Sequence, residues 1–204
     1  MFISTKGYRA LDAFQVAPAT GAMAAGLAAD SEVLQIRWTH ATNKCAIQEL
    51  TVNGMFATTA FAAGAIHLYS TIARAFTAAG TGGGTVTLTD DNQKLQTNHG
   101  DSGMGEIRIA TTAALGAGTK TLDSEAIGRI TTHSSGGAGS ATPIIGSIYL
   151  PTYSLFDHDV TNHESPIVLS TNEGVIVRAT VPITGVWTAS FTIKWVELTP
   201  FAEV

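Results

Sequence analysis

The sequence predicts an all-β protein: an antiparallel β-sandwich, with a jelly roll as the leading topology, preceded by an irregular N-terminal arm. Two observations lead to this fold class. Apolar and polar residues alternate with period two in about eight to ten short segments, which is the pattern of half-buried strands. Turn residues separate these segments, and no helical period of comparable length accompanies them. The 204 residues are enough for one such domain with a real core.

The alternation begins in the first half of the chain. Residues 32–38 and 65–76 each place their apolar side chains on one face of a strand, and a short helix is the alternative for the second segment. Between them, Asn53-Gly54 predicts a two-residue hairpin turn, because both positions of that turn need a positive φ. The apolar faces consist of Leu34, Ile36 and Trp38 in the first segment and Ile66, Leu68 and Ile72 in the second.

The most regular alternation lies close to the C-terminal end of the sequence. Residues 173–198 predict a half-buried antiparallel hairpin around a tight turn, with polar side chains that are exposed or meet another subunit. The apolar rows are Val175, Val177, Ala179, Val181 and Ile183, then Trp187, Ala189, Phe191, Ile193 and Trp195; the polar row is Thr188, Ser190, Thr192 and Lys194. Further strands are predicted at 84–92, 105–112, 143–156 and 165–170.

The first thirty residues differ from the rest. They lack strand alternation and carry isolated aromatic residues at Phe2, Tyr8 and Phe14, while their alanine-rich end favours one or two helical turns. We therefore divide the chain into an arm, 1–30, and a sandwich domain, 31–204. The arm either wraps back over its own sheet or reaches a neighbouring subunit. We expect its deletion to leave a folded domain and to weaken assembly.

Composition narrows the class of function. Only 13% of the residues are charged, the formal net charge is -5, and the 11 lysines and arginines are scattered, so we expect no nucleic-acid partner. No apolar run is long enough to span a membrane, and the N-terminus lacks the pattern of a signal peptide, so we expect synthesis in a cytoplasm and no membrane partner. The single cysteine, Cys45, is predicted to be a small packed side chain.

One short motif suggests an enzyme. Residues 99–105 contain Gly-Asp-Ser-Gly, the sequence around the nucleophile of trypsin-like serine proteases, and His40, Asp90 or Asp91, and Ser102 follow in the chain order of that triad. However, the Gly-Pro that usually follows is missing, and Ser102 lies in the middle of the chain. A triad is defined by geometry, so the favoured interpretation is a polar glycine loop before a strand.

Other residues suggest a bound ion or ligand, and each has a simpler interpretation. The histidines at 158 and 163 lie five residues apart, which fits no helical zinc pair, and the aspartates at 90 and 91 lack the spacing of a calcium loop. The glycine-rich segment 80–85 lacks the lysine of a phosphate loop and is predicted to be a flexible connection. We therefore predict no active site, no cofactor and no metal. The residues considered as ligands are His158, Asp159, His163, Glu164, Asp90, Asp91 and Asn92, and the tryptophans considered for sugar stacking are Trp38, Trp187 and Trp195.

The end of the chain resembles the C-terminal strands of tailed-bacteriophage virion proteins. In those proteins, isoleucine and leucine are followed by Glu-Gly, two hydrophobic residues and an arginine, and a final strand ends near Trp-x-Glu. The motif covers about a sixth of the chain. The matching residues here are Ile167, Leu169, Glu173, Gly174, Val175, Ile176, Arg178, Trp195 and Glu197.

The resemblance implies a jelly-roll cement or decoration protein. Such a protein binds between major capsid proteins on the outer surface of the phage capsid, as a homodimer or homotrimer, and has no catalytic residues. The arm residues Phe2, Ile3, Tyr8 and Phe14 are then candidates for contact with the capsid. The alternative function is a receptor-binding or carbohydrate-binding jelly roll on a tail or fibre, with Tyr149, Tyr153 and Phe156 as the candidate contact residues.

Overall fold

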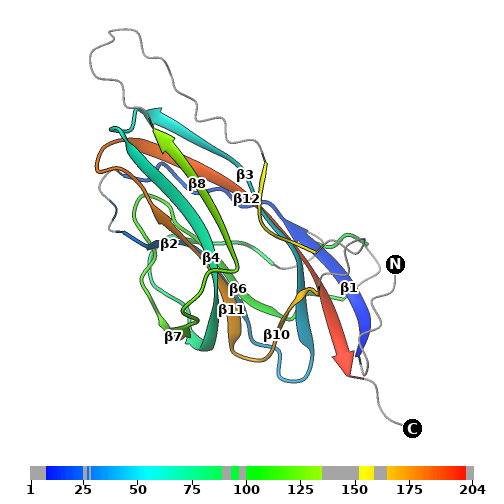
Figure 1. Cartoon of the computed structure of the whole chain (residues 1–204). Coiled ribbons are helices and arrows are strands. Elements are labelled where there is room, and N and C mark those ends of the chain that lie inside the picture. The colour runs from blue at the N-terminus through cyan, green and yellow to red at the C-terminus, as the bar shows by residue number, and fades with distance from the viewer. Residues whose placement is uncertain are drawn as a thin grey trace.

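Two antiparallel sheets pack face to face as a β-sandwich in this computed structural model (Figure 1). The structure describes residues 8–24, 27, 29–88, 93–96, 100–134, 152–158 and 165–200. None of these residues is helical, so the predicted all-β sandwich is confirmed. The short helices that were alternatives for residues 65–76 and for the described part of 21–32 are wrong. No helix in the described part of the chain is long and apolar enough to cross a membrane.

Sheet A has five strands and sheet B has seven. Sheet A has the order β1 (Tyr8–Val16), β12 (Val186–Pro200), β3 (Lys44–Thr59) and β10 (Ile167–Leu169), with β9 (Tyr153–Asp157) also paired to β3. Sheet B has the order β5 (Gly84–Thr85), β6 (Met104–Ile109), β2 (Ser31–Trp38), β11 (Glu173–Thr180), β4 (Gly64–Ala78) and β7 (Thr119–Leu122), with β8 (Gly128–Ser134) also paired to β4. The jelly-roll topology stays a prediction.

The main core lies between the inner faces of the two sheets. The apolar rows predicted for β2 and β4 are confirmed: Leu34, Ile36 and Trp38 are fully buried, and Ile66 and Leu68 are 1% exposed. The row on β12 from Trp187 to Trp195 is buried in the same core. Cys45 is also fully buried and free, as predicted.

The predicted closing hairpin is wrong, because its two strands belong to different sheets. β11 pairs with β2 and β4 in sheet B, whereas β12 pairs with β1 and β3 in sheet A. The five residues 181–185 join them. Five extended residues reach about 17 Å, which exceeds the roughly 10 Å between packed sheets. The apolar rows of the two strands therefore pack across the core from opposite sheets instead of lying side by side.

The hairpin predicted at Asn53-Gly54 is also wrong, because β3 continues straight through both residues. On β12, Ser190 pairs with Gly54 and the next residue pairs with Val52, so Asn53 is the extra residue of a β-bulge. Neither Asn53 nor Gly54 has the positive φ that the turn requires. The amide of Asn53 instead donates to the hydroxyl of Thr192 at 2.7 Å, which satisfies the polar side chain at the bulge.

The irregular arm predicted for residues 1–30 is wrong over Tyr8–Val16, which form β1. This strand pairs with β12 along the edge of sheet A (Figure 1). Tyr8 pairs with Pro200, and Phe14 is fully buried with its ring 5.4 Å from that of Trp195. Phe14 is therefore part of the core of its own chain. The candidate contact residues Phe2 and Ile3 lie outside the described residues.

The connection after β1 also packs on the sandwich. Thr20 and Met23 are 5% and 0% exposed, and the backbone of Met23 exchanges hydrogen bonds with that of Trp187. Of the two alternatives for residues 1–30, the described part wraps back over its own sheet. The division into two parts at residue 30 stays a prediction.

Candidate functional site

The Gly-Asp-Ser-Gly segment leads into β6, and its serine is tied to a buried carboxylate. The hydroxyl of Ser102 donates to Oε1 of Glu197 at 2.8 Å, and the backbone N–H of Gly103 donates to the same oxygen at 2.8 Å. The Ser102 oxygen also accepts a hydrogen bond from the N–H of Met104 at 3.1 Å. The hydroxyl proton therefore points to a carboxylate and not to an imidazole, unlike the serine of a protease triad.

His40 lies near this loop but has other partners. A Cβ added at Gly103 would lie 2.9 Å from Cδ2 of His40, so the two segments are in close contact. Nδ1 of His40 accepts hydrogen bonds from the N–H groups of Thr42 and Asn43, at 3.3 and 3.0 Å. The structure thus brings two members of the considered triad into one region without a hydrogen bond between them among those described. The third candidates, Asp90 and Asp91, lie outside the described residues.

The link between Glu197 and Ser102 is what sequence reasoning missed, because Glu197 was named only as part of the C-terminal motif. Glu197 is 4% exposed, and this burial raises the pKa of its carboxyl above the ordinary value of 4.5, with a smaller contribution from Asp12. The hydrogen bonds from Ser102 and Gly103 act in the opposite direction. A signal was present in the sequence, because Glu197 continues the period-two row of Trp195 and Ile193, whose side chains face the core.

The raised pKa of Glu197 predicts a specific pH dependence of stability. Below the unfolded-state pKa the carboxyl is protonated in both states, whereas at higher pH the unfolded chain releases this proton before the folded protein does. The contribution of Glu197 to the free energy of unfolding therefore falls as the pH rises from about 4.5 through the folded-state pKa. Urea denaturation between pH 4 and pH 8 measures this effect. We expect the free energy of unfolding of the wild-type protein to fall, relative to that of Glu197→Gln, as the pH rises.

The matched control is Glu125→Gln, which replaces an exposed carboxylate in the loop before β8. Its stability difference from wild type should change little over the same pH range. A difference between wild type and Glu197→Gln that stays constant from pH 4 to pH 8 contradicts the prediction.

A cavity of about 410 Å³ lies beside Ser102 and the start of β6. Asp101 and Glu106 supply its two carboxylates, and both already have cationic partners. Lys94 pairs with Asp101 at 2.9 Å, and Arg108 pairs with Glu106 at 2.5 Å. Among the described lining residues, each carboxylate is therefore ion-paired. Its lining residues include Thr85, Leu88, Asp101, Ser102, Met104 and Glu106.

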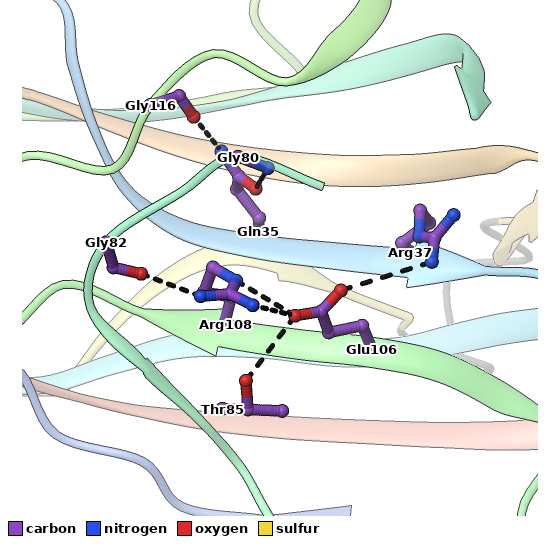
Figure 2. Close-up of polar contacts among 8 residues, drawn as sticks. All are labelled: Gln35, Arg37, Gly80, Gly82, Thr85, Glu106, Arg108 and Gly116. Carbon is purple, nitrogen blue, oxygen red and sulfur yellow. Dashed lines mark hydrogen bonds and ion pairs between the residues drawn. The ribbon is translucent and has the colours of Figure 1, made fainter. Parts of the chain in front are cut away.

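Figure 2 shows that the glycine-rich segment 80–85 is held in place by side chains of sheet B. The N–H of Gly80 donates to Gln35, whose amide donates in turn to the carbonyl of Gly116, both at 2.8 Å. Arg108 donates to the carbonyl of Gly82 at 2.8 Å. The prediction of a freely flexible, exposed connection is therefore wrong for Gly80, which is buried. The side chains of Gln35 and Arg108 therefore bind this loop to the sheet.

The other candidate ligands are mostly outside the described part of the chain. Asp159, His163, Glu164 and Tyr149 all lie there, while His158 is described and its N–H donates to the carbonyl of Gln48 at 2.7 Å. Within the described residues, no three His, Cys, Asp or Glu side chains are grouped closely enough to hold a metal ion.

The tryptophans are not available for sugar stacking, because Trp38, Trp187 and Trp195 are all fully buried. Their predicted core role is confirmed. Of the two described aromatic residues considered for carbohydrate binding, Phe156 packs partly buried against the core and Tyr153 is 39% exposed.

The outer face of sheet A is the broadest candidate for an interaction surface. On β12 and β3, the side chains that point away from the core lie opposite each other in register: Thr192 faces Thr51, and Lys194 faces Glu49, with which it forms an ion pair. Thr51 and Thr192 are themselves only 5% and 9% exposed. Thr51 also lies within hydrogen-bonding distance of Glu49 and Asn53, at 3.2 and 3.3 Å. We define the sheet A outer face as Glu49, Thr51, Asn53, Phe56, Thr188, Ser190, Thr192 and Lys194.

Exposed hydrophobic residues are concentrated on this sheet. Phe56 on β3 is 46% exposed and lies opposite Thr188, and Val168 on the edge strand β10 is 42% exposed. Tyr153 lies on β9, and Leu95, 55% exposed, donates its N–H to Ala13 of β1. Of the six large exposed hydrophobic side chains in the described residues, these four lie on or beside sheet A; Ile183 lies in the link between sheets, and Ile127 beside sheet B.

The surface of sheet A thus combines neutral polar groups that bond to one another with a few exposed apolar side chains. It also carries the charged pair of Glu49 and Lys194. In comparisons with protein-family models, curated proteins and solved structures, the chain matched none of them.

Proposed function

We propose that this protein is a non-enzymatic structural protein of the tailed-phage virion, which binds between major capsid proteins on the outer surface of the capsid and reinforces the shell. The proposal starts from the resemblance of residues 164–198 to the C-terminal strands of such virion proteins. The observation that carries it further is the sheet A outer face with its exposed hydrophobic residues. It needs no cofactor, nucleic acid or membrane, and takes as partners the major capsid protein and further copies of this chain.

The chemistry of the sheet A outer face suits this role. Thr51, Asn53 and Thr192 bond to one another or to Glu49, and Glu49 pairs with Lys194, so covering these groups leaves none of them without a partner. Phe56 supplies an aromatic side chain that gains by burial, and aromatic residues are enriched at the centres of protein interfaces. If several linked copies bind one shell at the same time, their combined affinity is much higher than the affinity of a single contact.

The absence of enzymatic activity is part of the same proposal. Ser102, the strongest candidate nucleophile, donates its proton to Glu197 within a structural network that joins the loop before β6 to the end of β12. We therefore expect Ser102→Ala to affect stability and not any reaction.

Particle binding tests the proposal directly. Phe56→Asp should weaken binding of the purified protein to undecorated shells by roughly thirtyfold, as loss of an interface anchor of about 2 kcal/mol predicts. The matched control is Ile127→Asp, at a side chain of similar exposure (37%) beside sheet B, which should bind like wild type.

Electron cryomicroscopy of particles that contain the protein gives the second test. Density in many copies on the outer shell, with the sheet A outer face against the capsid subunits, supports the proposal. Density in a few copies on the tail instead supports the receptor-binding alternative, and the absence of the protein from particles rules out both.

A further inference from the structure

Three side chains form a row across the outer face of sheet B. Tyr69 on β4 lies opposite Arg129 on β8 and opposite Arg178 on β11, so the three residues are direct cross-strand neighbours. The guanidinium carbons of Arg129 and Arg178 lie 4.8 and 4.7 Å from the centre of the Tyr69 ring. We call this row the Arg129–Tyr69–Arg178 ladder.

The ladder faces outward because its neighbours along β4 face the core. Leu68 is 1% exposed and Ser70 is fully buried, so the side chain of Tyr69 between them points to the other side of the sheet. Tyr69 is nevertheless only 6% exposed, since the two arginines cover its ring, while Arg129 itself is exposed. The aromatic ring therefore holds two cations at the surface.

Other cations of sheet B have carboxylate partners. Arg74 pairs with Glu173 at 2.6 Å and with Asp123 at 3.2 Å, and Lys120 pairs with Glu32 at 2.9 Å. Arg108 and Arg37 share the carboxylate of Glu106, at 2.5 and 4.0 Å (Figure 2).

The two arginines of the ladder are different. Among the described residues, neither has a carboxylate within 4.0 Å. Asp30 is one anion near them; its hydrogen bond with Tyr69 lowers the pKa of its carboxyl, and the two arginines add to this effect. Glu32 lies opposite Arg178 on β2, but its carboxylate pairs with Lys120 at 2.9 Å. Three cations, Arg129, Arg178 and Lys120, therefore face the carboxylates of Asp30 and Glu32, which leaves an excess of positive charge. In addition, Nε of Arg178 is buried without a hydrogen-bond acceptor in the described structure, while its Nη2 only approaches the Thr71 hydroxyl at 3.4 Å.

We propose that the Arg129–Tyr69–Arg178 ladder binds a carboxylate side chain from an acidic segment of a protein partner. A guanidinium matches a carboxylate with two parallel hydrogen bonds, and two guanidiniums on one ring present this chemistry from both sides. Stacking on Tyr69 already restricts the side chains of both arginines. They therefore lose less conformational entropy when a carboxylate binds than freely moving arginine side chains would lose. The site lies on an open sheet surface, which suits a protein segment better than a small molecule that needs a concave pocket. The proposal does not depend on the shell-binding function, since it concerns the opposite sheet.

A charged peptide probe tests this site. Fluorescein-labelled hexaglutamate is titrated with the protein at low ionic strength, where surface electrostatics are least screened, and binding is followed by fluorescence anisotropy. Hexaglutamate should bind wild type and hexaglutamine should not. The double variant Arg129→Gln/Arg178→Gln should bind hexaglutamate about tenfold more weakly. Arg74→Gln is the matched control, because Arg74 is an arginine of the same sheet that already has two carboxylate partners, and it should bind like wild type.

Two further measurements keep the result interpretable. Thermal unfolding shows whether the double variant is folded, and Arg129→Gln alone, at an exposed position, gives an intermediate affinity if the site is real. Charge reversal by Arg129→Glu should replace hexaglutamate binding with binding of hexalysine. Equal affinity of wild type and the folded double variant, an equal loss in Arg74→Gln, or no binding of hexaglutamate to wild type overturns the proposal. Shell binding by the double variant, measured separately, shows whether the two surfaces act independently.

Discussion

Replacing Phe14 by alanine is expected to lower the free energy of unfolding by about 3–5 kcal/mol, the usual cost of removing a buried aromatic side chain. Phe14 is fully buried, and its ring stacks nearly parallel to that of Trp195, with 17° between the planes. The alanine variant leaves a cavity between β1 and β12 that the surrounding strands fill only in part. Urea denaturation followed by tryptophan fluorescence measures the change, and it also reports on the environment of Trp195.

Two variants control this experiment. Phe14→Leu keeps most of the apolar volume and should cost less than half as much. Leu95→Ala removes a side chain that is 55% exposed next to β1 and should change stability by about 0.5 kcal/mol or less. A loss below 1 kcal/mol in Phe14→Ala shows that β1 is not part of the cooperative core. The same burial changes our expectation for deletion of residues 1–30, which removes Phe14 and Met23 from the core and should prevent stable folding.

Replacing Gly128 by valine is expected to cost more than about 3 kcal/mol, because no space exists for a side chain at this position. A Cβ at Gly128 would lie 1.8 Å from the carbonyl oxygen of Leu155 and 2.6 Å from its carbonyl carbon. Both are backbone atoms of β9, so relief requires a shift of a whole strand. Gly128 starts β8 of sheet B, and β9 belongs to sheet A; the hydroxyl of Ser70 also donates to the Leu155 carbonyl at 3.3 Å. The substitution therefore forces the two sheets apart where they meet.

Gly54→Ala is the matched control for this prediction. Gly54 also lies in a strand, but no atom lies within 4 Å of an added Cβ. Alanine there should be neutral or stabilise slightly, because it reduces the conformational entropy of the unfolded chain. The shift in thermal unfolding temperature distinguishes the two variants. Similar effects at both positions contradict the close approach of β8 and β9.

Sequence reasoning identified some of the candidate residues but not their partners in the fold. The Gly-Asp-Ser-Gly motif correctly drew attention to Ser102, but the partner of its hydroxyl is Glu197, 95 residues away. Chain order suggested His40 and an aspartate instead. Glu197 was recognisable only as a carboxylate in an apolar row, and the row alone does not reveal which loop covers its end. The Arg129–Tyr69–Arg178 ladder has no motif at all, because strand register brings its members together.

The amino-acid sequence by itself determined the fold class, the strands β2 and β4, and the faces of β11 and β12 that are buried. Period-two alternation is a local property, and burial of the apolar row follows from it in any sheet. Only the tertiary structure decided which strands are neighbours. An apolar row packs equally well beside a sheet partner or across the core, so the closing segment looked like a hairpin although its strands lie in different sheets. Residues 8–16 form a strand for a similar reason: they lack strand alternation in the sequence, but β12 offers them an edge to pair with and Trp195 offers a partner for Phe14.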